Sequence, residues 1–187
     1  MIPGKPSSDW LERARSHWRW RGDDRPPFAM TPGPGQESVW DYPRPPQLVP
    51  DTREVVVAWD GVEVARTRRA IRLLETSHAP SFYLPWDDVD RALFVPANGS
   101  SFCEWKGPAR YWSLVRGGHR LDNIAWSYPQ PLAGAEAITD CVAFYAAGLQ
   151  CTVGGAPVTP QPGGFYGGWV TAELVGPIKG SPESAGW

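Results

Sequence analysis

Short segments rich in β-branched and aromatic residues follow one another along most of this chain, separated by glycine, proline or asparagine. The first two, residues 55–59 and 62–67, flank the dipeptide Asp60-Gly61, which is typical of a two-residue β-hairpin turn. Because no long helical pattern alternates with such segments, the sequence predicts a mainly β fold: an antiparallel meander, an open barrel or a sandwich. Further strands are predicted at residues 71–75, 81–84, 101–106, 110–115, 124–128, 142–146 and 149–153.

The N-terminal residues differ from this pattern. Ser8 and Asp9, followed by Glu12, predict the start of a short helix. We expect it to end at Gly22 and to pack Trp10 and Trp18, which fall on one face, against the domain. Residues 26–50 contain many prolines, so we expect an extended strap without regular hydrogen-bonded structure. The predicted organisation is a helix and proline-rich strap at 1–50, a β core domain at 51–155, and a glycine- and aromatic-rich tail at 156–187 packed on the core.

Composition argues against several classes of partner and cofactor. Lysine and arginine number 18 and aspartate and glutamate 20, so no strong positive field favours nucleic acid or anionic lipid. No apolar run is long enough for a signal peptide or a membrane span, and we expect a cytoplasmic protein. The three cysteines form no close pair and the three histidines lie in separate segments, so no metal site is predicted. No glycine-rich phosphate loop is present, and no organic cofactor is expected.

The core resembles the bacterial family catalogued as domain of unknown function four hundred and twenty-seven, over roughly residues 55–153. The resemblance is carried by the segments LLETSHAPSFYLPWDDV, FCEWKGPARYWSL, IAWSYPQPLAGAEAI and CVAFYA. It implies a β-tent fold, in which two antiparallel meander sheets meet at a steep angle, as in R-type methionine sulfoxide reductases and the thalidomide-binding domain of cereblon. Those relatives hold a structural zinc in two cysteine pairs. This sequence lacks the pairs, so zinc is not expected here.

Aromatic residues concentrated in the core predict a pocket for an unknown small molecule. Aromatic walls with a few polar groups are typical of ligand sites, and Lys106 and Glu104 would be the polar anchors. The alternative for each aromatic residue is ordinary core packing. The predicted walls are Tyr83, Trp105, Tyr111, Trp126, Tyr128 and Phe144.

A second hypothesis is an enzyme that uses Cys103 and Lys106 in thiol or transferase chemistry. It requires that a nearby cation, Lys106 or His78, lower the pKa of the Cys103 thiol. In a regular strand Cys103 and Lys106 would point to opposite faces, unless Gly107-Pro108 ends the strand and redirects Lys106.

Two further possibilities remain open at this level. Glu75, Asp87 and Asp88 are a candidate acid/base set, although adjacent aspartates are also typical of a helix cap. The tryptophan-rich terminal segments are equally compatible with a structural or partner-binding role.

Overall fold

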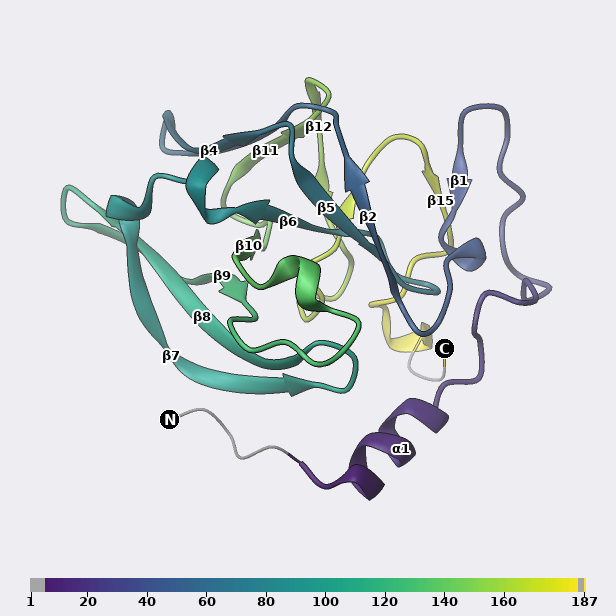
Figure 1. The fold of residues 1–187 in the computed structure, drawn as a ribbon. Coiled ribbons are helices and arrows are strands. Elements are labelled where there is room, and N and C mark those ends of the chain that lie inside the picture. The colour runs from purple at the N-terminus through teal and green to yellow at the C-terminus, as the bar shows by residue number, and fades with distance from the viewer. Residues whose placement is uncertain (1–5, 185–186) are drawn as a thin grey trace.

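Two antiparallel sheets dominate the computed structural model, which describes residues 6–184 and 187 (Figure 1). Neither closes into a barrel, and the predicted mainly β fold is confirmed. The larger sheet has the order β2 (Gln47–Asp51), β5 (Ala70–Leu74), β6 (Ser81–Pro85), β10 (Cys141–Phe144), β9 (His119–Ser127), β8 (Gly107–Arg116), β7 (Phe94–Cys103). The smaller sheet has the order β12 (Ala156–Pro157), β11 (Gln150–Val153), β3 (Val55–Trp59), β4 (Val62–Thr67).

Short elements complete the described chain. Two pairs of two-residue strands lie outside the main sheets: β1 (Glu37–Ser38) with β15 (Leu174–Val175), which run parallel, and β13 (Thr159–Pro160) with β14 (Trp169–Val170). Five single-turn 3-10 helices occur at Val39–Asp41, Trp86–Asp88, Arg91–Leu93, Glu136–Ile138 and Pro182–Ser184.

The predicted hairpin of β3 and β4 is confirmed at its exact bounds. Asp60 and Gly61 adopt φ values of 53° and 74°, and two consecutive positive φ values are what a type I′ turn requires. The twist of such a turn matches that of the flanking strands, so this dipeptide fixes the register locally.

The prediction that residues 26–50 form no regular hydrogen-bonded structure is wrong at two places, in β1 and at their C-terminal end. Residues 47–51 pair with β5 through five consecutive residues, although Pro50 lies among them. β2 is an edge strand of the larger sheet, where a missing N–H can face away from the neighbouring strand. The opposite edge, β7, likewise contains Pro96 and begins seven residues before the predicted strand at 101.

The N-terminal helix, α1 (Ser8–Ser16), is confirmed, with its N-cap one residue earlier than predicted. Ser7 caps it by accepting a hydrogen bond from the backbone N–H of Trp10. The ring of Trp10 packs edge-on against Phe102 of β7, 5.8 Å between centroids. The predicted cap at Asp87-Asp88 is wrong, because Asp90 caps the turn at Arg91–Leu93.

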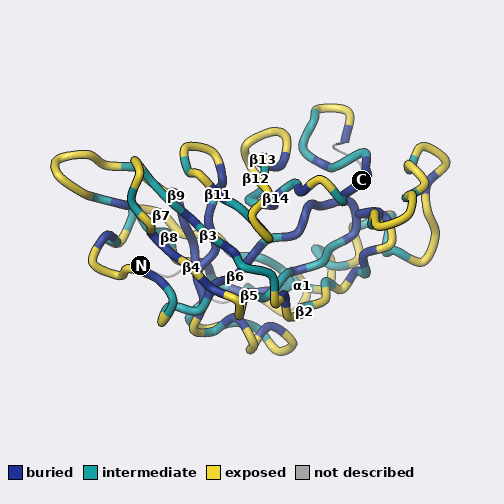
Figure 2. Tube along the Cα trace, turned by 90° about the horizontal axis from the view of Figure 1, so that it is seen from above, coloured by how far each residue is buried: buried dark blue, intermediate teal, exposed yellow. Residues whose placement is uncertain are grey.

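The larger sheet uses its two faces differently, because successive side chains of a strand point to opposite sides. One face packs against the smaller sheet and forms the main core, which includes Phe82, Leu84, Val142 and Phe144. The burial-coloured trace shows this sheet region as predominantly buried, with exposed segments concentrated in the loops (Figure 2). The other face carries a second cluster that includes Tyr83, Trp126, Tyr128 and Ala143.

Candidate functional site

A cavity of about 570 Å³ lies over this second face of the larger sheet. A row of paired residues crosses five strands beneath it: Ile71, Tyr83, Ala143, Trp126 and Tyr111. The small side chain of Ala143 separates the larger rings of Tyr83 and Trp126 along the row. The indole N–H of Trp126 still reaches the hydroxyl of Tyr83, 3.4 Å away.

Besides the predicted anchor Glu104, six of the residues predicted to form the pocket line this cavity, and one does not. Phe144 is fully buried in the main core between the two sheets. It neighbours Ala143 in β10, and the alternation of the strand turns it to the opposite face. Its assignment to the pocket is therefore wrong. The predicted residues that line the cavity are Tyr83, Trp105, Lys106, Tyr111, Trp126 and Tyr128.

Cys103 and Lys106, the two candidate catalytic residues, both line the cavity because the strand ends between them. β7 stops at Cys103 and β8 begins at Gly107, so Glu104, Trp105 and Lys106 form the hairpin turn. Gly107 has a φ of 97°, which glycine adopts without strain. The predicted continuous strand at 101–106 is thus wrong, and the redirection of Lys106 at Gly107 explains how both side chains reach one space.

The Lys106 ammonium is enclosed by aromatic and sulfur-bearing side chains. The residue is 9% exposed, and its Nζ lies 5.7 Å from the ring centroid of Tyr128. Burial by itself lowers the pKa of Lys106. Opposing charges raise it overall: Cys103, Tyr128 and Tyr83 contribute only in their ionised forms, whereas the Glu75 carboxylate contributes at neutral pH as well. Lys106 is therefore a charged hydrogen-bond donor at neutral pH, and not a free amine.

The Cys103 thiol is not activated by its surroundings. Burial raises its pKa, and the opposing effect of Lys106 is too small to reverse that shift. The side chain lies 3.8 Å from a carboxylate oxygen of Glu104, which also disfavours a thiolate. Since the thiolate is the nucleophilic form, this geometry does not support Cys103 as a nucleophile at neutral pH.

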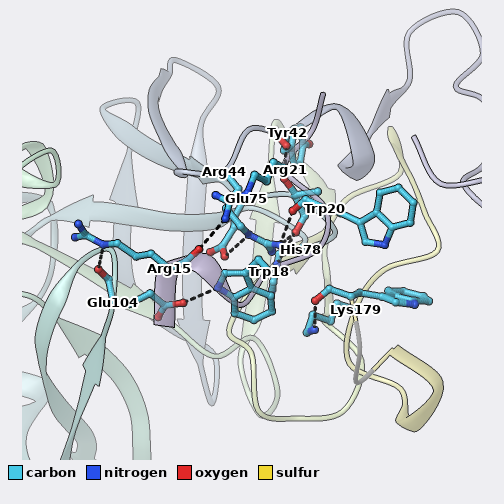
Figure 3. A network of polar contacts seen from close by, with 12 residues as sticks. Arg15, Trp18, Trp20, Arg21, Tyr42, Arg44, Glu75, His78, Glu104 and Lys179 are labelled. Carbon is cyan, nitrogen blue, oxygen red and sulfur yellow. Dashed lines mark hydrogen bonds and ion pairs between the residues drawn. The ribbon is translucent and has the colours of Figure 1, made fainter. Parts of the chain in front are cut away.

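Glu75 and His78 form a polar wall that the sequence did not identify as such. The Glu75 carboxylate accepts a hydrogen bond from the buried guanidinium of Arg44, at 3.3 Å (Figure 3). Burial raises the pKa of Glu75, but the charges of Lys106 and Arg44, and of His78 when it is protonated, outweigh this effect and lower the pKa overall, so Glu75 is ionised. Burial is the main cause that lowers the pKa of His78.

The tautomer of His78 follows from one contact. Its Nδ1 lies 2.9 Å from the carbonyl oxygen of Thr76, and because a carbonyl only accepts, Nδ1 carries the proton. In the neutral ring Nε2 is then an acceptor. Asp87 and Asp88 do not join this wall: Asp88 is held by Thr67 and Arg69, and Asp87 is largely exposed. The proposed acid/base set of Glu75 with these aspartates is therefore not assembled.

Segments from both ends of the chain line the cavity and partly cover it. Trp18, two residues beyond α1, donates its indole N–H to Glu104 at 2.9 Å (Figure 3). Its ring lies between two cations, 4.2 Å from the Arg44 guanidinium and 4.8 Å from the Lys179 ammonium. The helix had been expected to include Trp18 on its buried face, but it ends at Ser16. Trp18 is instead free to turn toward the cavity.

The C-terminal loop at residues 163–168 forms the other cover. Tyr166 packs edge-on against His78, 4.6 Å between ring centroids. Gly167 lies so close to Trp126 that a Cβ built on it would be 2.0 Å from the indole. Sequence alone identified the loop as glycine-rich but gave no signal that it lies over Trp126.

The described residues hold neither a candidate metal site nor a candidate membrane-spanning helix. No group of three or more His, Cys, Asp or Glu side chains is placed to hold a metal ion within residues 6–184 and 187. Over the same residues, no helix has both the length and the apolar character needed to cross a bilayer.

Comparison with known proteins gives a family without an assigned activity. The family model described as Domain of unknown function (DUF427) matches residues 47–155, more than half of the chain. No curated protein matches the chain. Trp18 and the loop at 163–168 lie outside the matched region.

Proposed function

We propose that this chain, which belongs to the DUF427 family, binds a small, largely aromatic molecule in the cavity over the larger sheet. One observation carries the proposal: a cavity of about 570 Å³ is walled by aromatic rings and contains a few buried polar groups. Ligand sites of drug-sized molecules have this volume and this mixture of surfaces.

The closure of the cavity supports the same proposal. The indole of Trp18 and the loop at 163–168 cover it from opposite ends of the chain. Partial enclosure of this kind removes part of a small ligand's surface from water, which supplies affinity. Both covers are short loop segments, so they can open without disturbing the sheets.

The thiol-enzyme alternative has less support. Cys103 lies in the cavity, but burial raises the pKa of its thiol and no described group reverses the shift. A partner-binding role has a different basis: Phe28 and Met30 are about half exposed. They lie outside the cavity, and nothing in their surroundings defines a partner.

A ligand screen by tryptophan fluorescence and thermal shift tests the proposal. A compound that binds the native state raises the melting temperature and perturbs the indoles at the cavity, Trp105 and Trp126. Trp126→Phe should weaken binding of any hit, since it removes wall surface and the hydrogen bond to Tyr83. Trp86→Phe is the matched control, because Trp86 packs on the main core. A hit that is equally weakened in both variants, or in neither, would contradict the cavity as the site.

A further inference from the structure

Lys106 has no hydrogen-bond acceptor or ion-pair partner among residues 6–184 and 187, although it is nine-tenths buried and lines the cavity. The Nζ atom of Lys106 lies over the face of the Tyr128 ring. The other buried lysine of the described chain, Lys179, shows how such a group is normally satisfied: it donates to the carbonyl oxygens of Ser184 and Trp187, at 3.2 and 2.7 Å. The side chain is largely buried and lines the cavity, so Lys106 is suited to an acceptor that enters the cavity from outside.

The charges around the cavity indicate the charge of that acceptor. Two carboxylates, Glu75 and Glu104, line it, and two cations stand beside them. Arg44 interacts favourably with both carboxylates, and Lys179 with Glu75. Arg15 also lies here and donates to the backbone carbonyl of Glu104, so the charges around the cavity do not cancel. Lys106 is nevertheless the only lysine or arginine among the described residues that line the cavity. A ligand group with one negative charge, such as a carboxylate, would pair with this one lining cation.

The aromatic surroundings indicate what carries that group. Tyr128 and Trp126 line the same cavity as Lys106, and the fully buried Tyr83 packs against both of their rings. Planar rings pack well on such surfaces. Resting on the proposed function, we propose that the ligand is a planar aromatic monocarboxylate whose carboxylate pairs with Lys106 while its ring lies against these aromatic side chains.

The experiment compares acids with their uncharged amides of the same shape. Isothermal titration calorimetry would measure the Kd of benzoate against benzamide, and of indole-3-acetate against indole-3-acetamide. A charge-assisted hydrogen bond to a buried ammonium should make the acid of at least one pair bind about tenfold or more tightly than its amide. If the amides bind as well as the acids, the cavity binds small molecules but the charge inference is wrong. If neither member of either pair binds the folded protein, the inference fails together with the proposed function for these ring classes.

Substitution of Lys106 assigns the preference to this residue. Lys106→Met should abolish the preference for the acid and leave amide binding within about twofold, whereas Lys106→Arg should retain part of the preference. Persistence of the full preference in Lys106→Met would overturn the assignment. Thermal unfolding shows whether each variant is folded, and the comparison of acid with amide on the unmodified protein decides the charge question without either variant.

Discussion

The indole N–H of Trp18 donates a hydrogen bond of 2.9 Å to the carboxylate of Glu104, which lies in the same hairpin turn as Lys106. This hydrogen bond thus connects the N-terminal segment to the hairpin turn that carries Lys106, whose ammonium has no partner among the described residues. Glu104 also accepts, through its backbone carbonyl, a hydrogen bond from Arg15 of α1. The turn is therefore the main anchor of the N-terminal segment at the cavity.

Glu104→Ala should weaken the attachment of the N-terminal segment to the hairpin turn. The variant loses the acceptor for Trp18, so local opening of residues 8–18 becomes more frequent while the sheets stay intact. Hydrogen exchange followed by mass spectrometry should show faster exchange in those residues and unchanged exchange in β9 and β10. Glu104→Gln keeps an acceptor oxygen and should change exchange much less. Equal effects of the two variants would show that the hydrogen bond does not hold the segment.

Gly167→Ala should destabilise the protein by about 1–3 kcal/mol, the usual cost of forcing an extra group into a packed site. The added Cβ would lie 2.0 Å from the indole of Trp126, a buried and rigid ring. Gly33→Ala is the control, since its nearest neighbour is the flexible end of Gln36. Urea unfolding measures both. A Gly167→Ala protein as stable as the control would mean that the loop does not rest on Trp126.

His78 should make stability fall with acidification below about pH 6.5. Burial lowers the pKa of His78 in the folded state, so the unfolded chain binds a proton that the folded chain does not. Stability is then greater above the unfolded pKa and declines as the pH falls from there toward the folded pKa, by at most about 1.4 kcal/mol per pH unit.

Urea unfolding at pH 7.5 and 5.5 tests this sign. The decline should be smaller in His78→Gln than in the unmodified protein. His119→Gln, at a largely exposed position, is the control and should leave it unchanged. An identical pH dependence in all three proteins would contradict the role assigned to His78.

The Cys103 thiol should be alkylated slowly at neutral pH. Burial raises the pKa of its thiol, so the thiolate fraction is smaller than in a free cysteine. Cys141 and Cys151 are more buried, with pKa values raised to about 11 and about 12, and should react later still. Iodoacetamide labelling at pH 7.5, with a urea-unfolded sample as reference, measures this by mass spectrometry. Labelling of native Cys103 as fast as in the unfolded sample would restore the thiol-enzyme hypothesis.

Local rules were sufficient for much of the fold. The β3–β4 hairpin followed from Asp60-Gly61, because two residues with positive φ select one turn type. The paired strand at 47–51 does not follow from the sequence. Pro50 argues against a strand unless that strand lies at the edge of a sheet, as it does here. Nothing local distinguishes an edge strand from a central one.

The full lining of the cavity could not be predicted from sequence patterns alone. Alternation predicts that Ala143 and Phe144 face opposite ways, but not which of them faces the core. Phe144 was therefore assigned to the wrong side. Trp18 and Tyr166 reach the cavity from distant parts of the chain through contacts with Glu104 and His78, and no spacing rule relates residues so far apart.

The most direct test of the binding account is a titration of ¹⁵N-labelled protein with indole-3-acetate, observed through the indole N–H resonances of the tryptophans. Each resonance is assigned by the matching Trp→Phe variant. We predict that the resonances of Trp18, Trp105 and Trp126, which line the cavity, shift with a single Kd, and that those of Trp59, Trp86, Trp112 and Trp169 in the main core do not. Shifts confined to tryptophans outside the cavity, or no shifts at all, would contradict the account.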